Sequence, residues 1–159
     1  MLRPILLFAL AASLSLAQNL SEKPDFSGRW RMDKDKSNFA GFDAPDIITR
    51  NVDQHGPVMN VHTVQTSGDK TSMSDVTYSL DGSPTQNIVS GRDAECKTYW
   101  DGETLVVRTS MKTSSGDDEL IEDRWSLSEN KQVLTIASHI ETEKGEADMT
   151  LVCNRQSKK

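Results

Sequence analysis

The chain has 159 residues and a formal net charge of −6, with 24 acidic residues against 18 lysines and arginines. This length is typical of a single domain. The only basic cluster is Lys158-Lys159, whereas nucleic acids and anionic membrane surfaces attract clustered basic side chains. We therefore expect no nucleic-acid partner and no insertion into a membrane.

The first residues have the pattern of a secretory signal peptide. Arg3 precedes the apolar run Pro4–Leu16, and Ser15-Leu16-Ala17 is a small-x-small cleavage site. A membrane anchor needs about 20 apolar residues, and this run is shorter. We expect residues 1–17 to be removed and the exported domain, residues 18–159, to be periplasmic or extracellular.

The rest of the chain has the pattern of short β-strands. Runs rich in Val, Ile, Thr and aromatic residues recur between Gly, Asp, Asn and Ser turns, and helical periodicity is almost absent. We expect ten strands, at Phe26–Asp33, Ile47–Gln54, Val58–Gln65, Met73–Leu80, Thr85–Ser90, Ala94–Trp100, Thr104–Met111, Glu119–Leu127, Val133–Ile140 and Asp148–Arg155.

Alternation and short turns predict how these strands are arranged. In Thr104–Met111, Leu105, Val107, Thr109 and Met111 share one face and polar residues share the other, so one face is buried. Short connections join antiparallel neighbours, and a long one-faced sheet loses its edges by closing. We predict an all-β fold, a single up-and-down antiparallel β-barrel of about 8–10 strands. The alternative is a two-sheet sandwich, which the absence of a long crossover disfavours.

One segment, residues 34–46, does not fit the meander. A connection of this length often forms a lid, with Phe39 and Phe42 as the candidate lid residues. The alternative is a surface Ω-loop that packs both rings over the barrel end.

Several motifs resemble the calycin superfamily, which includes lipocalins and fatty-acid-binding proteins. The first is Gly28-x-Trp30 in the first strand, within Asp25-Phe26-Ser27-Gly28-Arg29-Trp30. Further motifs are similar to uncharacterised lipocalin-like proteins exported by bacteria: Asp33-x-x-Lys36-Ser37, Gly91-Arg92, Trp100-Asp101-Gly102-x-x-Leu105-Val106 and Asp123-Arg124-Trp125-Ser126-Leu127-Ser128.

The resemblance implies a structural plug at one barrel end. Trp30 would close that end, and Arg155, near the end of the last strand, would cover the indole. The Arg-x-Tyr carboxylate clamp of fatty-acid-binding proteins is missing, since Leu151 and Cys153 occupy the matching positions. Fatty-acid carriage therefore does not transfer with the fold.

A few inward positions are candidates for a lumen site. Arg50 shares a face with Ile48 and Val52, and a buried guanidinium needs an anion or a carboxylate. The anion could belong to a ligand; the alternatives are a position at the rim or a pair with Asp123, which alternation also places inward. The remaining candidates, which could line a pocket or fill it, are Tyr78, Trp100, Trp125, Leu105 and Leu151.

No motif indicates catalysis, a metal or a cofactor. Nucleophile-elbow, zinc-protease and phosphate-loop patterns are absent from the sequence, and His55, His62 and His139 are best interpreted as solvated side chains. The sequence therefore gives no reason to expect an enzyme. Alternation places Cys96 and Cys153 inward on strands that are not neighbours, which disfavours a disulfide.

Two functions remain open at this point. The first is an exported barrel that takes a small, partly apolar or amphipathic ligand into its lumen. The second is a secreted or envelope interaction protein or inhibitor that contacts its partner through loops around a solid barrel.

Overall fold

A computed structural model describes residues 23–157, so the proposed signal peptide at residues 1–17 lies outside the described residues. The described part contains ten strands and one short 3-10 turn, and all ten predicted strands are confirmed with shifted ends. In chain order they are β1 Gly28–Met32, η1 Lys34–Lys36, β2 Ile47–His55, β3 Val58–Ser67, β4 Lys70–Ser79, β5 Thr85–Val89, β6 Arg92–Asp101, β7 Thr104–Lys112, β8 Asp118–Leu127, β9 Val133–Thr142 and β10 Gly145–Arg155.

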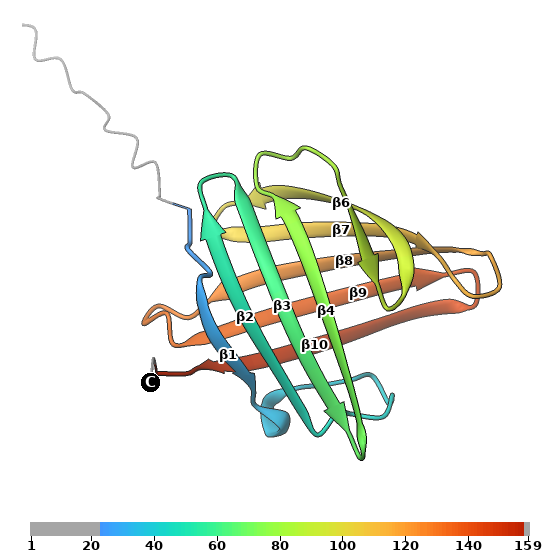
Figure 1. Cartoon of the computed structure of the whole chain (residues 1–159), viewed down its shortest axis with the longest axis horizontal. Coiled ribbons are helices and arrows are strands. Elements are labelled where there is room, and N and C mark those ends of the chain that lie inside the picture. Colours follow the sequence, from blue (N-terminus) through green and yellow to red (C-terminus); the bar gives the residue numbers. More distant parts are fainter. Residues whose placement is uncertain (1–22, 158–159) are drawn as a thin grey trace, which may run out of the picture.

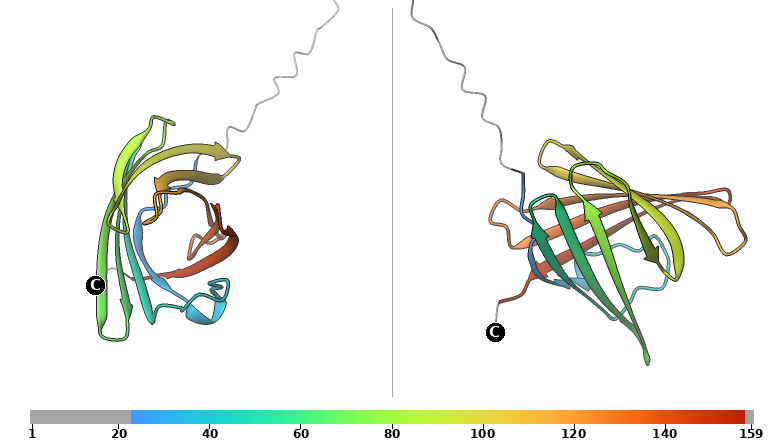
Figure 2. Two further views of the ribbon diagram at one scale, coloured as in Figure 1. Left: turned by 90° about the vertical axis from the view of Figure 1, so that its right-hand side faces the viewer. Right: turned by 45° about the horizontal axis from the view of Figure 1, so that its top comes forward.

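The strands form one antiparallel sheet that curls into a barrel (Figure 1). Their order in the sheet is β4-β3-β2-β1-β10-β9-β8-β7-β6-β5. Strand β1 joins the two ends of the chain, because Trp30 is opposite Arg50 of β2 on one side and opposite Arg155 of β10 on the other. The all-β barrel predicted from the sequence is thus confirmed (Figure 2).

The barrel is not fully closed, because no backbone ladder joins β4 to β5. The sequence predicted an unbroken meander, and that detail was wrong. Strand β5 has only five residues and follows Pro84, which has no backbone donor. A side chain joins the two strands instead: the Asn87 amide accepts from the Thr77 N–H at 2.9 Å and donates to the Thr77 carbonyl at 3.0 Å.

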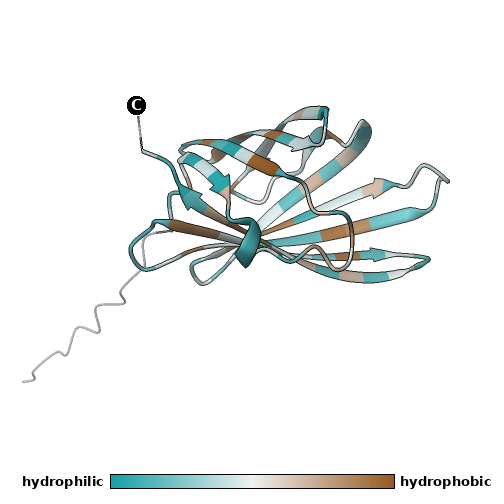
Figure 3. Ribbon diagram, turned by 90° about the horizontal axis from the view of Figure 1, so that it is seen from below, coloured by the Kyte–Doolittle hydropathy of each residue, from teal (hydrophilic) through white to brown (hydrophobic). Residues whose placement is uncertain are grey.

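The core fills one end of the barrel. Trp30, Trp125, Phe26, Met59 and Leu105 are almost fully buried. Hydrophobic and hydrophilic residues alternate along the strands, as Figure 3 shows, so this apolar face points inward. The inward face predicted for residues 104–111 is confirmed, although Val106 on the opposite face is also fully buried.

The connection between β1 and β2 crosses the other end of the barrel, at the bottom of Figure 1. It is held by a bridge between Asn38 and Thr150 of β10 and by Asp46, whose carboxylate accepts from the Gly68 N–H at 2.8 Å. Phe39 packs against the core, whereas Phe42 is 62% exposed. The Ω-loop alternative, in which both rings pack over the barrel end, therefore fails for Phe42.

Within residues 23–157, no helix has the length and apolar character needed to cross a membrane.

Candidate functional site

The barrel that is packed at one end is hollow toward the other. A cavity of about 520 Å³ is lined by residues of β2, β3, β4, β7 and β8, and by residues 88–91 at the end of β5 and in the turn that follows it. Its lining includes residues of both β4 and β5, on either side of the seam between these strands. The lumen is therefore solid at one end and hollow at the other.

Arg50 of β2 points into this cavity. It shares the inward face with Val52 and lies opposite Thr63 of β3, as the alternation predicts. Its guanidinium carbon lies 5.3 Å from the centroid of the Trp125 ring. The Nε atom is buried and has no hydrogen-bond partner among the described residues. Arg50 is therefore a partly buried cation with one buried donor, Nε, that lacks an acceptor.

Asp123 of β8 lines the same cavity, but it does not pair with Arg50. Among the described residues, no nitrogen of Arg50 lies within 4.0 Å of a carboxylate oxygen, so the ion pair considered from the sequence is not formed. The Ser138 hydroxyl donates to Asp123 Oδ1 at 2.5 Å. Burial raises the pKa of Asp123, while the Ser138 hydrogen bond and the charge of Arg50 lower it only in part.

Tyr78 and Trp125 form an aromatic wall beside these charges. Their ring centroids are 6.3 Å apart in an edge-to-face arrangement. Burial, and secondarily the charge of Asp123, raise the pKa of the Tyr78 hydroxyl, so Tyr78 stays a neutral hydrogen-bonding group. The Trp125 Nε1–H is buried without a partner among the described residues.

The other lumen candidates lie outside the cavity lining. Trp100 stacks on Phe26 at a centroid distance of 6.2 Å, and Leu105 and Leu151 are buried in the packed core. The structure therefore brings together Arg50, Tyr78 and Trp125, of which Arg50 and Tyr78 line the cavity, whereas Trp125, like Leu105 and Leu151, belongs to the packed core.

Trp30 and Arg155 lie against each other at the packed end. Trp30 is 1% exposed, its Nε1–H donates to the Phe26 carbonyl at 3.0 Å, and the Arg155 guanidinium lies 4.2 Å from the ring centroid. Arg155 also donates to the Ser27 carbonyl at 2.8 Å. Gly28 leaves room for this guanidinium, because a Cβ atom there would collide with Arg155 Nη1. These contacts account for the spacing of Gly28-x-Trp30.

The mouth of the cavity has two features that the sequence analysis missed. Met73 of β4 is 70% exposed and Ile88 of β5 is 54% exposed, and both border the opening. The sequence could have indicated these residues, because both are apolar residues at solvent-facing positions of the edge strands β4 and β5. The candidate lid residues Phe39 and Phe42 do not line the cavity.

Both cysteines are free, buried thiols, on β6 and β10 respectively. Burial raises the pKa of Cys153 to about 11. The Cys96 sulfur lies 3.5 Å from the Thr109 hydroxyl, which is a weak hydrogen bond.

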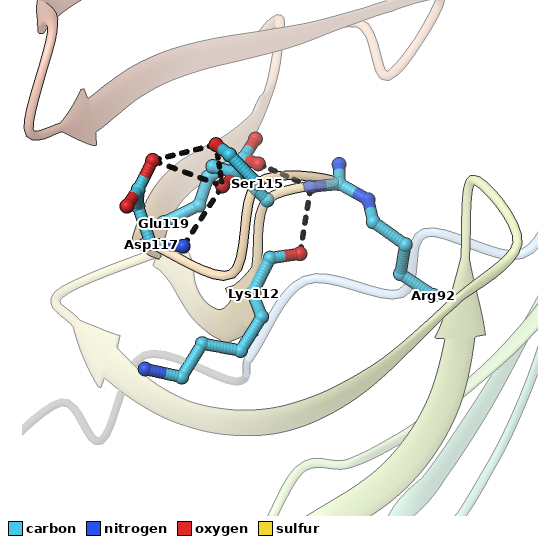
Figure 4. Close-up of polar contacts among 6 residues, drawn as sticks. Arg92, Lys112, Ser115, Asp117 and Glu119 are labelled. Carbon is cyan, nitrogen blue, oxygen red and sulfur yellow. Dashed lines mark hydrogen bonds and ion pairs between the residues drawn. The ribbon is translucent and has the colours of Figure 1, made fainter.

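The conspicuous polar cluster at the β7–β8 turn is occupied by protein contacts (Figure 4). Arg92 donates to the Lys112 carbonyl at 3.0 Å and to Glu119 at 2.5 Å, which ties β6 to β7 and β8. Ser115 donates to Asp117 at 2.6 Å within the turn. Among the described residues, no group of three or more His, Cys, Asp and Glu side chains is arranged to hold a metal ion.

Comparison of the fold with solved structures gives consistent neighbours. A secretory abundant heat soluble protein from Ramazzottius varieornatus matches with a TM-score of 0.59 at 13% identity, covering 82% of this chain and 94% of that one. Zebrafish ileal bile acid-binding protein, complexed with cholic acid, matches with a TM-score of 0.56 at 12% identity, and the match covers 82% of this chain and 98% of that one. Human cRBP IV matches with a TM-score of 0.54 at 14% identity, and the match covers 84% of this chain and 99% of that one.

These neighbours show that the chain shares the fold of known antiparallel β-barrels. At such low identity the likeness concerns the fold alone. The sequence itself matches no known family model and no curated protein.

Proposed function

We propose that this chain is an exported, lipocalin-like barrel that binds a small amphipathic molecule in its lumen, with a polar head at Arg50. The observation that carries the proposal is the buried Arg50 Nε without a partner at a cavity of about 520 Å³. Cavities of roughly 300–1,000 Å³ with a few convergent polar groups are typical of small-molecule sites.

The energetics favour an anionic or hydrogen-bonding head at this position. A buried donor without an acceptor costs about 1–3 kcal/mol, and charged groups cost more. A ligand oxygen at Arg50 would recover this energy, and the Trp125 and Tyr78 rings beside it offer an apolar surface. The exposed Met73 and Ile88 would contact an apolar tail at the mouth.

Several of the structural neighbours are named for apolar or amphipathic ligands, such as cholic acid and arachidonic acid. This agrees with lumen binding in the present chain but does not identify its ligand. Export is proposed from residues 1–17, and a bacterial origin from the motif resemblance. The alternative of a loop-based interaction protein assumed a solid barrel, and the barrel is solid at one end only.

The test is a fluorescence titration with 8-anilinonaphthalene-1-sulfonate, an anionic amphipathic probe. We expect saturable binding at one site, abolished by Ser74→Trp, which places a bulky ring in the cavity from β4. The matched control is Gln86→Trp on the outer face of β5, where binding should be unchanged. Equal binding by the two variants would contradict a lumen site.

A further inference from the structure

The cavity contains a basic and an acidic side chain that form no ion pair with each other. Arg50 and Asp123 both line it, from β2 and β8, but no ion pair joins them within 4.0 Å. Arg50 is directed over the Trp125 ring, and Asp123 has a single partner, Ser138, on Oδ1. Asp123 Oδ2 therefore remains available to the cavity.

Solvent in the open cavity can hydrate both groups, but a bound ligand displaces this water. A charge that loses hydration without gaining a partner is strongly destabilising. A simple anion would satisfy Arg50 and leave Asp123 either facing a like charge or carrying a proton. A simple cation would satisfy Asp123 and leave Arg50 without an acceptor. A head group that carries both charges satisfies both side chains at once.

We propose that the ligand of this cavity is a zwitterionic amphiphile, with an anionic group at Arg50 and an ammonium group at Asp123. This inference rests on the proposed lumen-binding function and names the class of ligand. The remaining inward side chains are compatible with such a head, because Thr63, Ser74 and Thr109 add short polar groups to the lining.

The cavity is poorly suited to a plain alkyl carboxylate. Such a ligand needs cationic partners around its head, whereas here a carboxylate lies in the same cavity. Like charges in a shared site of low dielectric discriminate against the wrong ligand. Asp123 would thus act as the specificity-determining residue.

The experiment compares two ligands that differ only by one ammonium group: decanoate and 2-aminodecanoate. Both are titrated by calorimetry into the wild-type protein, Asp123→Asn, and the matched surface variant Asp93→Asn, whose carboxylate lies on the outer face of β6. We expect the wild type and Asp93→Asn to bind 2-aminodecanoate about tenfold more tightly than decanoate, the effect of one charge-assisted hydrogen bond. Asp123→Asn should abolish or reverse this preference.

The outcomes separate the two proposals. If decanoate binds as tightly as 2-aminodecanoate in the wild type, or if Asp123→Asn keeps the tenfold preference, the zwitterion proposal is wrong while lumen binding stands. If neither ligand binds and Ser74→Trp leaves probe binding unchanged, the lumen function itself fails. A circular dichroism spectrum and a melting curve for Asp123→Asn show that the variant is folded.

Discussion

Replacement of Trp30 by alanine should strongly destabilise the barrel. Trp30 is 1% exposed, lies at the junction of β10, β1 and β2, and is covered by Arg155 at 4.2 Å. Truncating a buried Phe or Trp to Ala typically costs about 3–5 kcal/mol, and the loss of a cation–π contact at a partly exposed site adds about 1 kcal/mol. We therefore expect a loss of about 4–6 kcal/mol in the free energy of unfolding.

The assay is urea unfolding of residues 18–159, followed by tryptophan fluorescence and by far-UV circular dichroism. For a domain of this size the loss corresponds to a fall in Tm of about 10–20 °C. Phe42→Ala is the matched control, because this ring is 62% exposed and its loss should change stability by less than about 0.5 kcal/mol. A Trp30→Ala variant within about 1 kcal/mol of the wild type would refute the structural role of this residue.

Three further predictions concern the seam, the buried acid and the thiols. Asn87→Ala should remove the side-chain bridge between β4 and β5, so hydrogen exchange at the Thr77 amide should become faster. Exchange in β8 should stay constant. An unchanged exchange rate at Thr77 in the variant would show that the bridge is dispensable. Because burial raises the pKa of Asp123 above its ordinary value of 3.8, the unfolded chain loses its proton first as the pH rises. The free energy of unfolding of the wild type should therefore fall relative to Asp123→Asn as the pH rises above about 4, and parallel profiles would contradict this. Burial raises the pKa of Cys153 to about 11, so this thiol should resist Ellman's reagent at about pH 8 until the protein is unfolded. A Cys96–Cys153 disulfide peptide in unreduced digests would contradict the free state of both thiols.

The fold could be predicted from the sequence because local signals agree with one another. Alternation in residues 104–111 and the short turns fix which face is buried and which strands are neighbours. The same alternation placed Arg50 and Asp123 on the inward face, where the structure finds them. Inward orientation is a property of a single strand, so it can be derived from a single segment.

The site could not be derived in the same way, because it depends on contacts between distant strands. Whether Arg50 pairs with Asp123 or lies over Trp125 is decided by the relative positions of β2 and β8, which alternation does not determine. The open β4–β5 seam was missed because a side chain, Asn87, replaces a backbone ladder there. Whether an inward residue fills the lumen or lines a cavity is likewise a matter of packing, as Leu105 and Tyr78 illustrate.

The central claim is that the cavity beside Arg50 holds a ligand, and native mass spectrometry tests it most directly. The wild-type protein and Ser74→Trp would be isolated from the same host under identical conditions, and their intact masses compared without denaturation. The account predicts that the wild type carries an additional small-molecule mass, lost on denaturation, and that Ser74→Trp carries none. A wild-type protein that is free of any small molecule and takes up neither 2-aminodecanoate nor decanoate under these conditions would contradict the claim.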